Sequence, residues 1–283
     1  MMAANLAFLI NDTQVKLAGG LMPMGEIIFL RGIFTTLVIG GVVVALGDHR
    51  AIATLFHRTL LWRTLCEVGA VLLFLTALFR MPIADITVIL QIIPLMITAG
   101  SACFLAERVG WRRWTAIAVG FVGVVIVIRP GGEGFNAYAL LAFGAALVVA
   151  MRDLVTRTMP AVVPTTLVAA LSAIAVTLAG AGLGIGEDWV VPDQKALGLA
   201  AGAGVFIAAG YGMAIVAMRH GEIATVSPFR YSVIVWAIIV GYLVWGEVPD
   251  MLTLVGTTII ISTGIYTLYR ERQLSAVPVG PQL

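Results

Sequence analysis

The chain has 283 residues, of which 60% are hydrophobic and 11% are charged. Soluble domains carry about 25% charged residues, so this composition and the mean hydropathy of +1.04 exclude an ordinary soluble domain and indicate an integral membrane protein. The net charge of +2 comes from basic residues scattered through the chain, without a basic patch interleaved with aromatic residues, so no nucleic-acid partner is expected.

Ten apolar runs follow one another along the chain and predict ten spanning helices of about 20 residues each. The expected spans are 2–20, 24–46, 62–80, 83–105, 112–128, 137–156, 163–186, 196–218, 224–246 and 252–269. The first run lacks a preceding basic segment and a small-residue cleavage site, so we interpret it as a span and not as a signal peptide. Cys66 and Cys103 lie inside apolar runs and predict neither a disulfide framework nor a metal site.

The distribution of basic residues predicts the orientation. If the N-terminus is cytoplasmic, alternate connections place eleven arginines on the cytoplasmic side and four basic residues on the other side. Because cytoplasmic connections carry an excess of Lys and Arg, both termini are predicted to be cytoplasmic. The eleven are Arg50, Arg58, Arg63, Arg108, Arg112, Arg113, Arg152, Arg157, Arg219, Arg270 and Arg272, and the four are Lys16, Arg80, Arg129 and Lys195.

An internal repeat divides the chain into two halves. Asp12 and Lys16 recur as Asp153 and Arg157, and Glu107 recurs as Glu247 at nearly the same offset. With five spans in each half, the halves run in opposite directions through the membrane, an architecture typical of alternating-access carriers. The expected domains are therefore a first repeat over 1–135, a second repeat over 136–270 and a cytoplasmic tail over 271–283.

One charged stretch interrupts the ninth span. Ser227 to Tyr231 contains Pro228 and Arg230; an Arg is costly in hydrocarbon and a Pro frees a backbone carbonyl. We expect a bent or broken helix there, with Arg230 and Tyr231 facing a wet cavity. The alternative is an Arg that pairs inside the bundle for packing alone.

Other intramembrane residues are candidates to line that cavity. Glu67 and Arg230 are predicted at similar depth from the cytoplasm, so Glu67 is a proton-coupling site, a ligand for a cationic substrate group, or the partner of Arg230. Gln91 matches Tyr231 in the repeat and would supply polar contacts. Aromatic rings could stack a planar group or cradle a sulfonium or ammonium; the candidates besides Tyr231 are Tyr211, Trp236 and Phe74.

Four ionisable residues fall in the outer parts of the first two spans: Asp12, Lys16, Glu26 and Arg31. Asp12 and Lys16 share a helix face at a spacing of four residues and can neutralise each other. Asp153 and Arg157 are their counterparts near the cytoplasmic end. All six are interpreted as gate residues or as structural ion pairs, both interpretations remaining open.

The order of these motifs resembles the drug/metabolite transporter superfamily, in its EamA branch. The resemblance covers nearly the whole chain and rests on six features: Asn11-Asp12 with Lys16; Glu26 to Arg31; Arg80 to Pro94 followed by Glu107; Gly120 to Arg129; Arg152-Asp153 with Arg157; and Pro228 to Tyr231 with Gly246-Glu247. It implies an all-α membrane protein with ten transmembrane helices, arranged as two inverted five-helix EamA repeats around a central cavity. Members of the family usually begin several residues before the first span, whereas this chain begins Met1-Met2-Ala3.

Within that branch, the Asn11-Asp12 opening and the Pro228 to Tyr231 stretch look most like carriers of S-adenosylmethionine. Riboflavin and amino-acid carriers are similar alternatives. The expected function is thus secondary transport of a small organic metabolite across a bacterial cytoplasmic membrane by alternating access. No cofactor is expected; the partners are the solute and the lipid bilayer, with a second copy of the chain as a further candidate.

Two other classes compete with the carrier interpretation. A membrane-embedded enzyme would need clustered carboxylates or histidines, and the chain shows no hydrolytic or redox motif, because His49, His57 and His220 all fall in predicted connections. An enzyme is therefore not expected. A membrane scaffold without a transport pathway would not need the intramembrane charges, which are expensive to place there.

Overall fold

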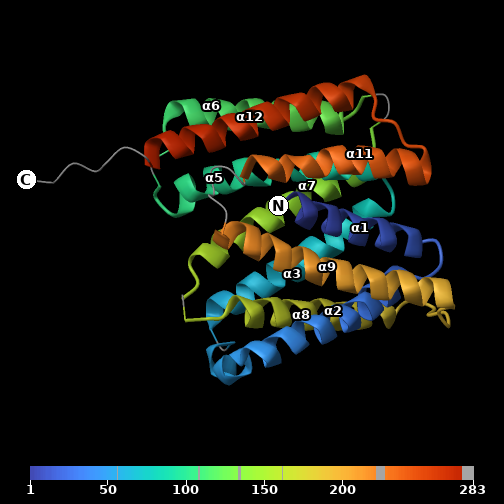
Figure 1. Cartoon of the computed structure of the whole chain (residues 1–283). Helices are drawn as coiled ribbons and strands as arrows, with labels where there is room; N and C mark the ends of the chain where they lie inside the picture. Colours follow the sequence, from blue (N-terminus) through green and yellow to red (C-terminus); the bar gives the residue numbers. More distant parts are fainter. Residues whose placement is uncertain (56, 108, 133–134, 161, 221–226, 276–283) are drawn as a thin grey trace, which may run out of the picture.

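The computed structural model describes the chain except residues 56, 108, 133–134, 161, 221–226 and 276–283. The described part is helical and contains no strand (Figure 1). Its elements are α1 (Met2–Ala18), α2 (Met24–Leu46), η1 (Asp48–Leu55), α3 (Arg58–Leu78), α4 (Ile83–Leu90), α5 (Ile93–Phe104), α6 (Trp111–Ile128), α7 (Tyr138–Arg157), α8 (Thr165–Gly184), α9 (Gln194–His220), η2 (Ser227–Tyr231), α11 (Ser232–Trp245) and α12 (Met251–Ser275).

Eight described segments are long and apolar enough to cross a membrane, α4 and α5 counting as one segment, Ile83–Phe104. Phe229–Trp245 is a shorter apolar helix, and α1 has 17 residues. The protein is therefore a multi-pass membrane protein, while the count of ten spans stays a prediction. Helix α12 continues into the expected tail as far as Ser275, and the first residues expected for the ninth span lie outside the described part.

Consecutive long helices reverse direction, so their connections gather at two ends of the bundle (Figure 1). We call one the Lys16 end; it holds the connections α1–α2, α3–α4 and α11–α12. The other is the Arg157 end, which holds the connections α2–α3, α5–α6 and α7–α8.

The major helix contacts join the two halves of the sequence. Helix α2 packs on α8 at one flank and α6 packs on α12 at the other, with α1 on α9 and α3 on α7 between them (Figure 1). In the predicted repeat, α1 corresponds to α7, α2 to α8, α3 to α9 and α6 to α12. The contact between α1 and α9 therefore corresponds to the contact between α7 and α3, and each flanking pair consists of two corresponding helices. This pattern is the one expected of two repeated halves, and the division of the chain into two repeats stays a prediction.

Glycines allow the two flanking pairs to approach closely. A Cβ atom at Gly180 of α8 would lie 2.6 Å from the backbone nitrogen of Phe29 and 2.9 Å from the carbonyl oxygen of Gly25. At the other flank, a Cβ atom at Gly256 of α12 would lie 2.6 Å from the carbonyl oxygen of Gly123. Small residues of this kind let backbones pack together in membranes, where burial of apolar surface supplies little force.

In both halves the described helix departs from regular α geometry at positions that match in the predicted repeat. Between α4 and α5 the backbone N–H groups of Gln91 and Ile92 donate three residues back, to Val88 and Ile89, and Pro94 in the first turn of α5 has no N–H to donate. In the second half, the 3₁₀ turn η2 ends at Tyr231, which is the counterpart of Gln91 in the repeat, and α11 follows. The expected irregular helix around Pro228 and Arg230 therefore has a counterpart in the first half.

Candidate functional site

A cavity of about 390 Å³ lies among α2, α3, α8, α9 and the end of α7. It extends from Arg31 in the bundle interior toward the Arg157 end, where two lining residues, Thr156 and Thr165, are exposed. Most of its wall is apolar, with residues such as Val71, Val176 and Ile207. The cavity therefore reaches the molecular surface at the Arg157 end, and its volume suits a small organic molecule.

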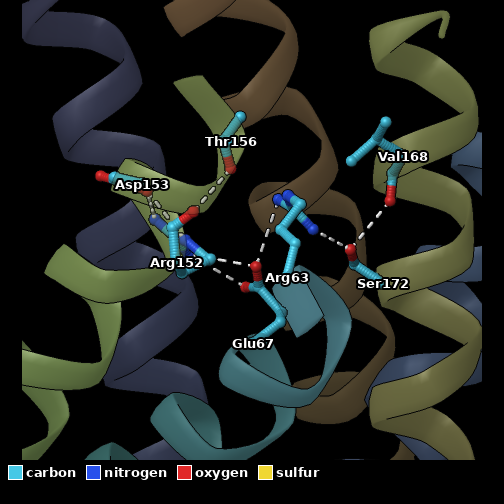
Figure 2. A network of polar contacts seen from close by, with 7 residues as sticks. All are labelled: Arg63, Glu67, Arg152, Asp153, Thr156, Val168 and Ser172. Carbon is cyan, nitrogen blue, oxygen red and sulfur yellow. Dashed lines mark hydrogen bonds and ion pairs between the residues drawn. The ribbon is translucent and has the colours of Figure 1, made fainter. Parts of the chain in front are cut away.

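Glu67 is the carboxylate in the described cavity wall, and two arginines hold it (Figure 2). Its side chain accepts hydrogen bonds at 3.1 and 3.2 Å from Nη1 of Arg152 on α7. Nη2 of Arg63 lies 3.3 Å from Oε2 of Glu67. Arg63 and Glu67 are four residues apart on α3, so they share one helix face. A carboxylate that is only 6% exposed requires such compensation, because burial of an unpaired charge is costly.

Glu67 and its two arginines are part of a longer polar network that crosses α3, α7 and α8 (Figure 2). At one side, Arg152 donates from Nε and Nη2 to Oδ1 of Asp153, at 2.9 and 2.7 Å. At the other side, Arg63 donates to Oγ of Ser172 on α8, and that hydroxyl donates to the carbonyl of Val168 at 2.8 Å. The Nε atom of Arg63 is buried and makes no hydrogen bond within the described residues. Arg63 lines the cavity, but its Nε donor is enclosed by protein.

Arg31 is a second guanidinium in the same wall and is only 5% exposed. Its Nη1 donates to Oδ1 of Asn11 at a long 3.4 Å, and Asn11 donates to Asp12 at 2.8 Å. Asp12 is thus close enough to balance the charge of Arg31 without a direct ion pair among the described contacts. In the described lining, two guanidinium groups face one carboxylate, which favours a solute that carries a carboxylate of its own.

The lining includes two of the predicted cavity residues, Glu67 and Tyr211. The Tyr211 ring packs edge-on against Phe8, with centroids 5.3 Å apart, and offers an aromatic surface beside the charges. Arg63 and Ser172 were missed. The sequence signal for Arg63 is that it lies in the expected third span, four residues before Glu67. At that spacing the two side chains share one face of a helix.

Arg230 lies elsewhere: it is exposed on η2 and does not belong to the described lining. Its backbone carbonyl and that of Phe229 accept hydrogen bonds from Asn5 at 3.1 and 2.9 Å, which attaches η2 to α1. The carboxylate predicted opposite it, Glu67, is paired with Arg63 and Arg152 instead. The structure therefore does not bring Arg230 and Glu67 together.

The other predicted cavity residues lie outside the described lining as well. Tyr231 packs in the apolar core, and Phe74 and Trp236 pack against it. The Tyr231 hydroxyl and the Trp236 indole N–H are buried without a hydrogen-bond partner in the described part of the chain. Gln91 lies at the helix break, where its side chain donates to the carbonyl of Thr87 at 3.5 Å.

Two of the predicted gate residues, Lys16 and Arg157, pair with carboxylates of the other half and not with the acid four residues away on their own helix. Lys16 forms an ion pair with Glu247 at 2.9 Å instead of pairing with Asp12. Arg157 lies 3.5 Å from Glu107 instead of pairing with Asp153, whose partner is Arg152. The side chains at the ends of α1 and α7 reach across to the other half, because that half packs directly beside them.

Glu26, the remaining member of the predicted gate set, accepts a hydrogen bond from the backbone of Val190 at 3.1 Å. That contact fastens α2 to the segment before α9. Within the described residues, no group of three or more His, Cys, Asp and Glu side chains is placed to hold a metal ion.

Comparison with known proteins gives consistent matches. Residues 136–270 match the EamA-like transporter family. The S-adenosylmethionine uptake transporter of Rickettsia conorii is 28% identical over 269 residues, covering 93% of this chain and 89% of the relative. The riboflavin transporter of Vibrio cholerae is 30% identical over 267 residues, covering 92% and 89%.

Two further proteins are similar to this chain, one in sequence and one in structure. The pseudopaline exporter CntI of Pseudomonas aeruginosa is 27% identical over 265 residues, covering 91% of this chain and 90% of the exporter. A solved crystal structure shares the fold with a TM-score of 0.62 at 20% sequence identity, covering 97% of this chain and 98% of the other. The named relatives are transporters for different solutes.

Proposed function

The chain belongs to the EamA-like transporter family, within the drug/metabolite transporter superfamily, and from this premise we propose that it carries a small zwitterionic metabolite across a bacterial cytoplasmic membrane by alternating access. The related uptake and export proteins share transport as a class and differ in solute. The best candidate solute is S-adenosylmethionine or a close analogue.

The observation that carries this proposal is the charged wall of the cavity. Arg31 and Arg63, the two guanidinium groups of the described lining, are suited to a substrate carboxylate, since guanidinium groups bind carboxylates through charge-assisted hydrogen bonds. Glu67 is already compensated by two arginines, so a cationic group of the solute would rely more on the Tyr211 ring. The apolar remainder of the wall suits a planar or aliphatic body.

The direction in which the cavity faces follows from the predicted orientation. Several arginines lie at the Arg157 end: Arg50 in η1, and Arg58, Arg112 and Arg113 in the first turns of α3 and α6. Under the positive-inside rule this end is cytoplasmic, and the cavity then faces the cytoplasm. Both termini would lie on that side.

Uptake into proteoliposomes tests the proposal. Labelled S-adenosylmethionine should enter, and excess unlabelled substrate should compete. Arg63→Gln should raise KM about 10- to 100-fold, because a hydrogen bond to a charged group contributes about 1.5–3 kcal/mol. Arg230→Gln is the matched control: this exposed arginine should tolerate the change, with KM within about twofold of wild type.

The same uptake assay distinguishes S-adenosylmethionine from the rival solutes. Competition by riboflavin or by an amino acid, without competition by S-adenosylmethionine, would retain the carrier and change its substrate. No solute movement in sealed vesicles that contain folded protein would overturn transport and favour the scaffold alternative. Equal KM values for Arg63→Gln and wild type would remove Arg63 from the binding site.

A further inference from the structure

Two ion pairs of the structure are related to each other by the internal repeat. Lys16 of α1 pairs with Glu247, two residues beyond α11, and Arg157 of α7 pairs with Glu107, three residues beyond α5. Lys16 and Arg157 occupy corresponding positions of the two repeats, and so do Glu107 and Glu247. Each pair joins a cation of one half to a carboxylate of the other half. Exchange of the halves therefore converts one pair into the other.

The same backbone feature positions both glutamates. The residue before each is in the left-handed conformation, with φ of 53° at Ala106 and 69° at Gly246. The N–H of Glu107 then donates to the carbonyl of Ser101 at 3.2 Å, and that of Glu247 donates to the carbonyl of Gly241 at 3.1 Å. Both bonds reach six residues back, and both helices end in the left-handed way typical of helix C-termini. The two carboxylates are thus equivalent in local structure as well as in sequence position.

The two pairs differ in how tightly they are closed. At the Lys16 end, the charged atoms are 2.9 Å apart and the side chains are 11% and 22% exposed. Lys16 also donates to the carbonyl of Met81 at 3.0 Å, Glu247 accepts from the N–H of Ile83 at 3.0 Å, and the ammonium lies 4.6 Å from the Trp245 ring centroid. These contacts tie α1, the start of α4 and the end of α11 together.

At the Arg157 end, the corresponding pair is looser. Its charged atoms are 3.5 Å apart and its side chains are 48% and 52% exposed. The cavity opens beside it, because Thr156 and Met159 are lining residues. One end of the bundle is therefore closed by a buried pair, while the equivalent pair at the open end is exposed to solvent.

We infer that Lys16–Glu247 and Arg157–Glu107 are alternating locks, of which one is buried while the other is exposed. This inference rests on the proposed transport function. Inverted repeats produce the opposite-facing state when the halves exchange conformations. In that state Arg157–Glu107 closes and loses water, while Lys16–Glu247 opens. The attraction within an ion pair is stronger in the drier surroundings of a closed end, and hydrogen bonds such as those of Lys16 to Met81 and of Ile83 to Glu247 offset the cost of desolvation. Each pair then stabilises the state in which it is buried. Glu107 and Glu247 are positioning residues for the helix ends and do not bind the solute.

Distances between spin labels at each end test the locks without any substrate. In a Cys66→Ala/Cys103→Ala background, one label pair is placed at Leu21→Cys and Val248→Cys, and another at Phe104→Cys and Thr158→Cys. All four positions are exposed, and each pair flanks one lock. The purified full chain is measured in lipid nanodiscs by pulsed electron–electron double resonance.

Lys16→Gln should shift the Leu21–Val248 distances to longer values and the Phe104–Thr158 distances to shorter values. Arg157→Gln is the matched control and should leave the Leu21–Val248 distances at their wild-type values, because its pair is already exposed. Lys16→Arg, which keeps the positive charge and the donors, should leave the wild-type distributions at both ends, and Glu247→Gln should give the same shifts as Lys16→Gln, which decides the question if Lys16→Gln fails to fold.

Unchanged distances in both Lys16→Gln and Glu247→Gln, or lengthening at both ends together, would overturn the inference, as would shifts in Lys16→Arg equal to those in Lys16→Gln. Solute movement does not enter this measurement. If Lys16→Gln shifts the Leu21–Val248 and Phe104–Thr158 distances as expected, but the wild-type protein moves no solute in proteoliposomes, only the proposed function is overturned.

Discussion

Replacement of Glu67 by Gln removes the buried negative charge that two partly buried arginines share. The carboxylate accepts two hydrogen bonds from Arg152 and lies 3.3 Å from Arg63, and its side chain is 8% exposed. Loss of one partner of a buried ion pair costs about 3–5 kcal/mol. Arg152 keeps Asp153 and Arg63 keeps Ser172, so we expect the lower part of that range, about 3 kcal/mol.

The free energy of unfolding in mixed detergent micelles measures this loss. Glu107→Gln is the matched control, since its pair at the Arg157 end has both side chains about half exposed and should contribute less than about 1 kcal/mol. Combination of Glu67→Gln with Arg63→Gln should cost less than the sum of the two single changes, because the second change removes the charge that the first left unpaired. Equal stabilities of Glu67→Gln and Glu107→Gln would refute the assignment of Glu67 as the centre of the network.

Two further predictions, each with a smaller expected effect on stability, concern the backbone at Ala106 and the exposed carboxylate of Asp250. Ala106→Gly should raise the free energy of unfolding by about 1 kcal/mol, because Ala106 has φ of 53° and a left-handed conformation costs a residue with a Cβ about 1–2 kcal/mol; a loss of stability in the same unfolding assay would contradict this reasoning. Asp250, in the connection before α12, has its pKa lowered to about 2 by the hydrogen bond from Arg129. Its stabilising contribution should thus be present above the ordinary pKa of 3.8 and disappear as the pH falls toward 2. With the side chain 55% exposed, the contribution should be below about 1 kcal/mol, and Asp250→Asn should abolish this part of the acid dependence; an identical pH profile for both proteins would refute the assignment.

Positions along the chain were easier to predict than the directions in which side chains face. The apolar runs predicted the membrane class and most helix bounds, and the correspondence between the halves reappears in the caps before Glu107 and Glu247. The irregular helix near Pro228 was also expected. These features depend on local composition and on residue spacing.

The partner of Glu67 could not be predicted in that way. Its depth in the third span suggested Arg230, but depth leaves open how each helix is rotated about its axis. That rotation is set by packing between helices, and α3 packs on α7, which brings Arg152 to Glu67. The spacing of Asp12 and Lys16 predicts only that the two side chains share one face of a helix. It could not predict that Lys16 pairs with Glu247, because that carboxylate belongs to the other half of the chain and is brought to Lys16 by packing between helices.

The contacts between halves also bear on how the protein is made. The first half leaves the ribosome before the second, so α2 and α6 enter the bilayer while α8 and α12, the helices against which they pack, have yet to be synthesised. Their close-packed faces, at Gly25 and Gly123, lack these partners until residues 165–184 and 251–275 are made. Final assembly of the first helices therefore waits for the last one to be inserted, and a chain that stops after residue 135 would lack the partners of both flanks.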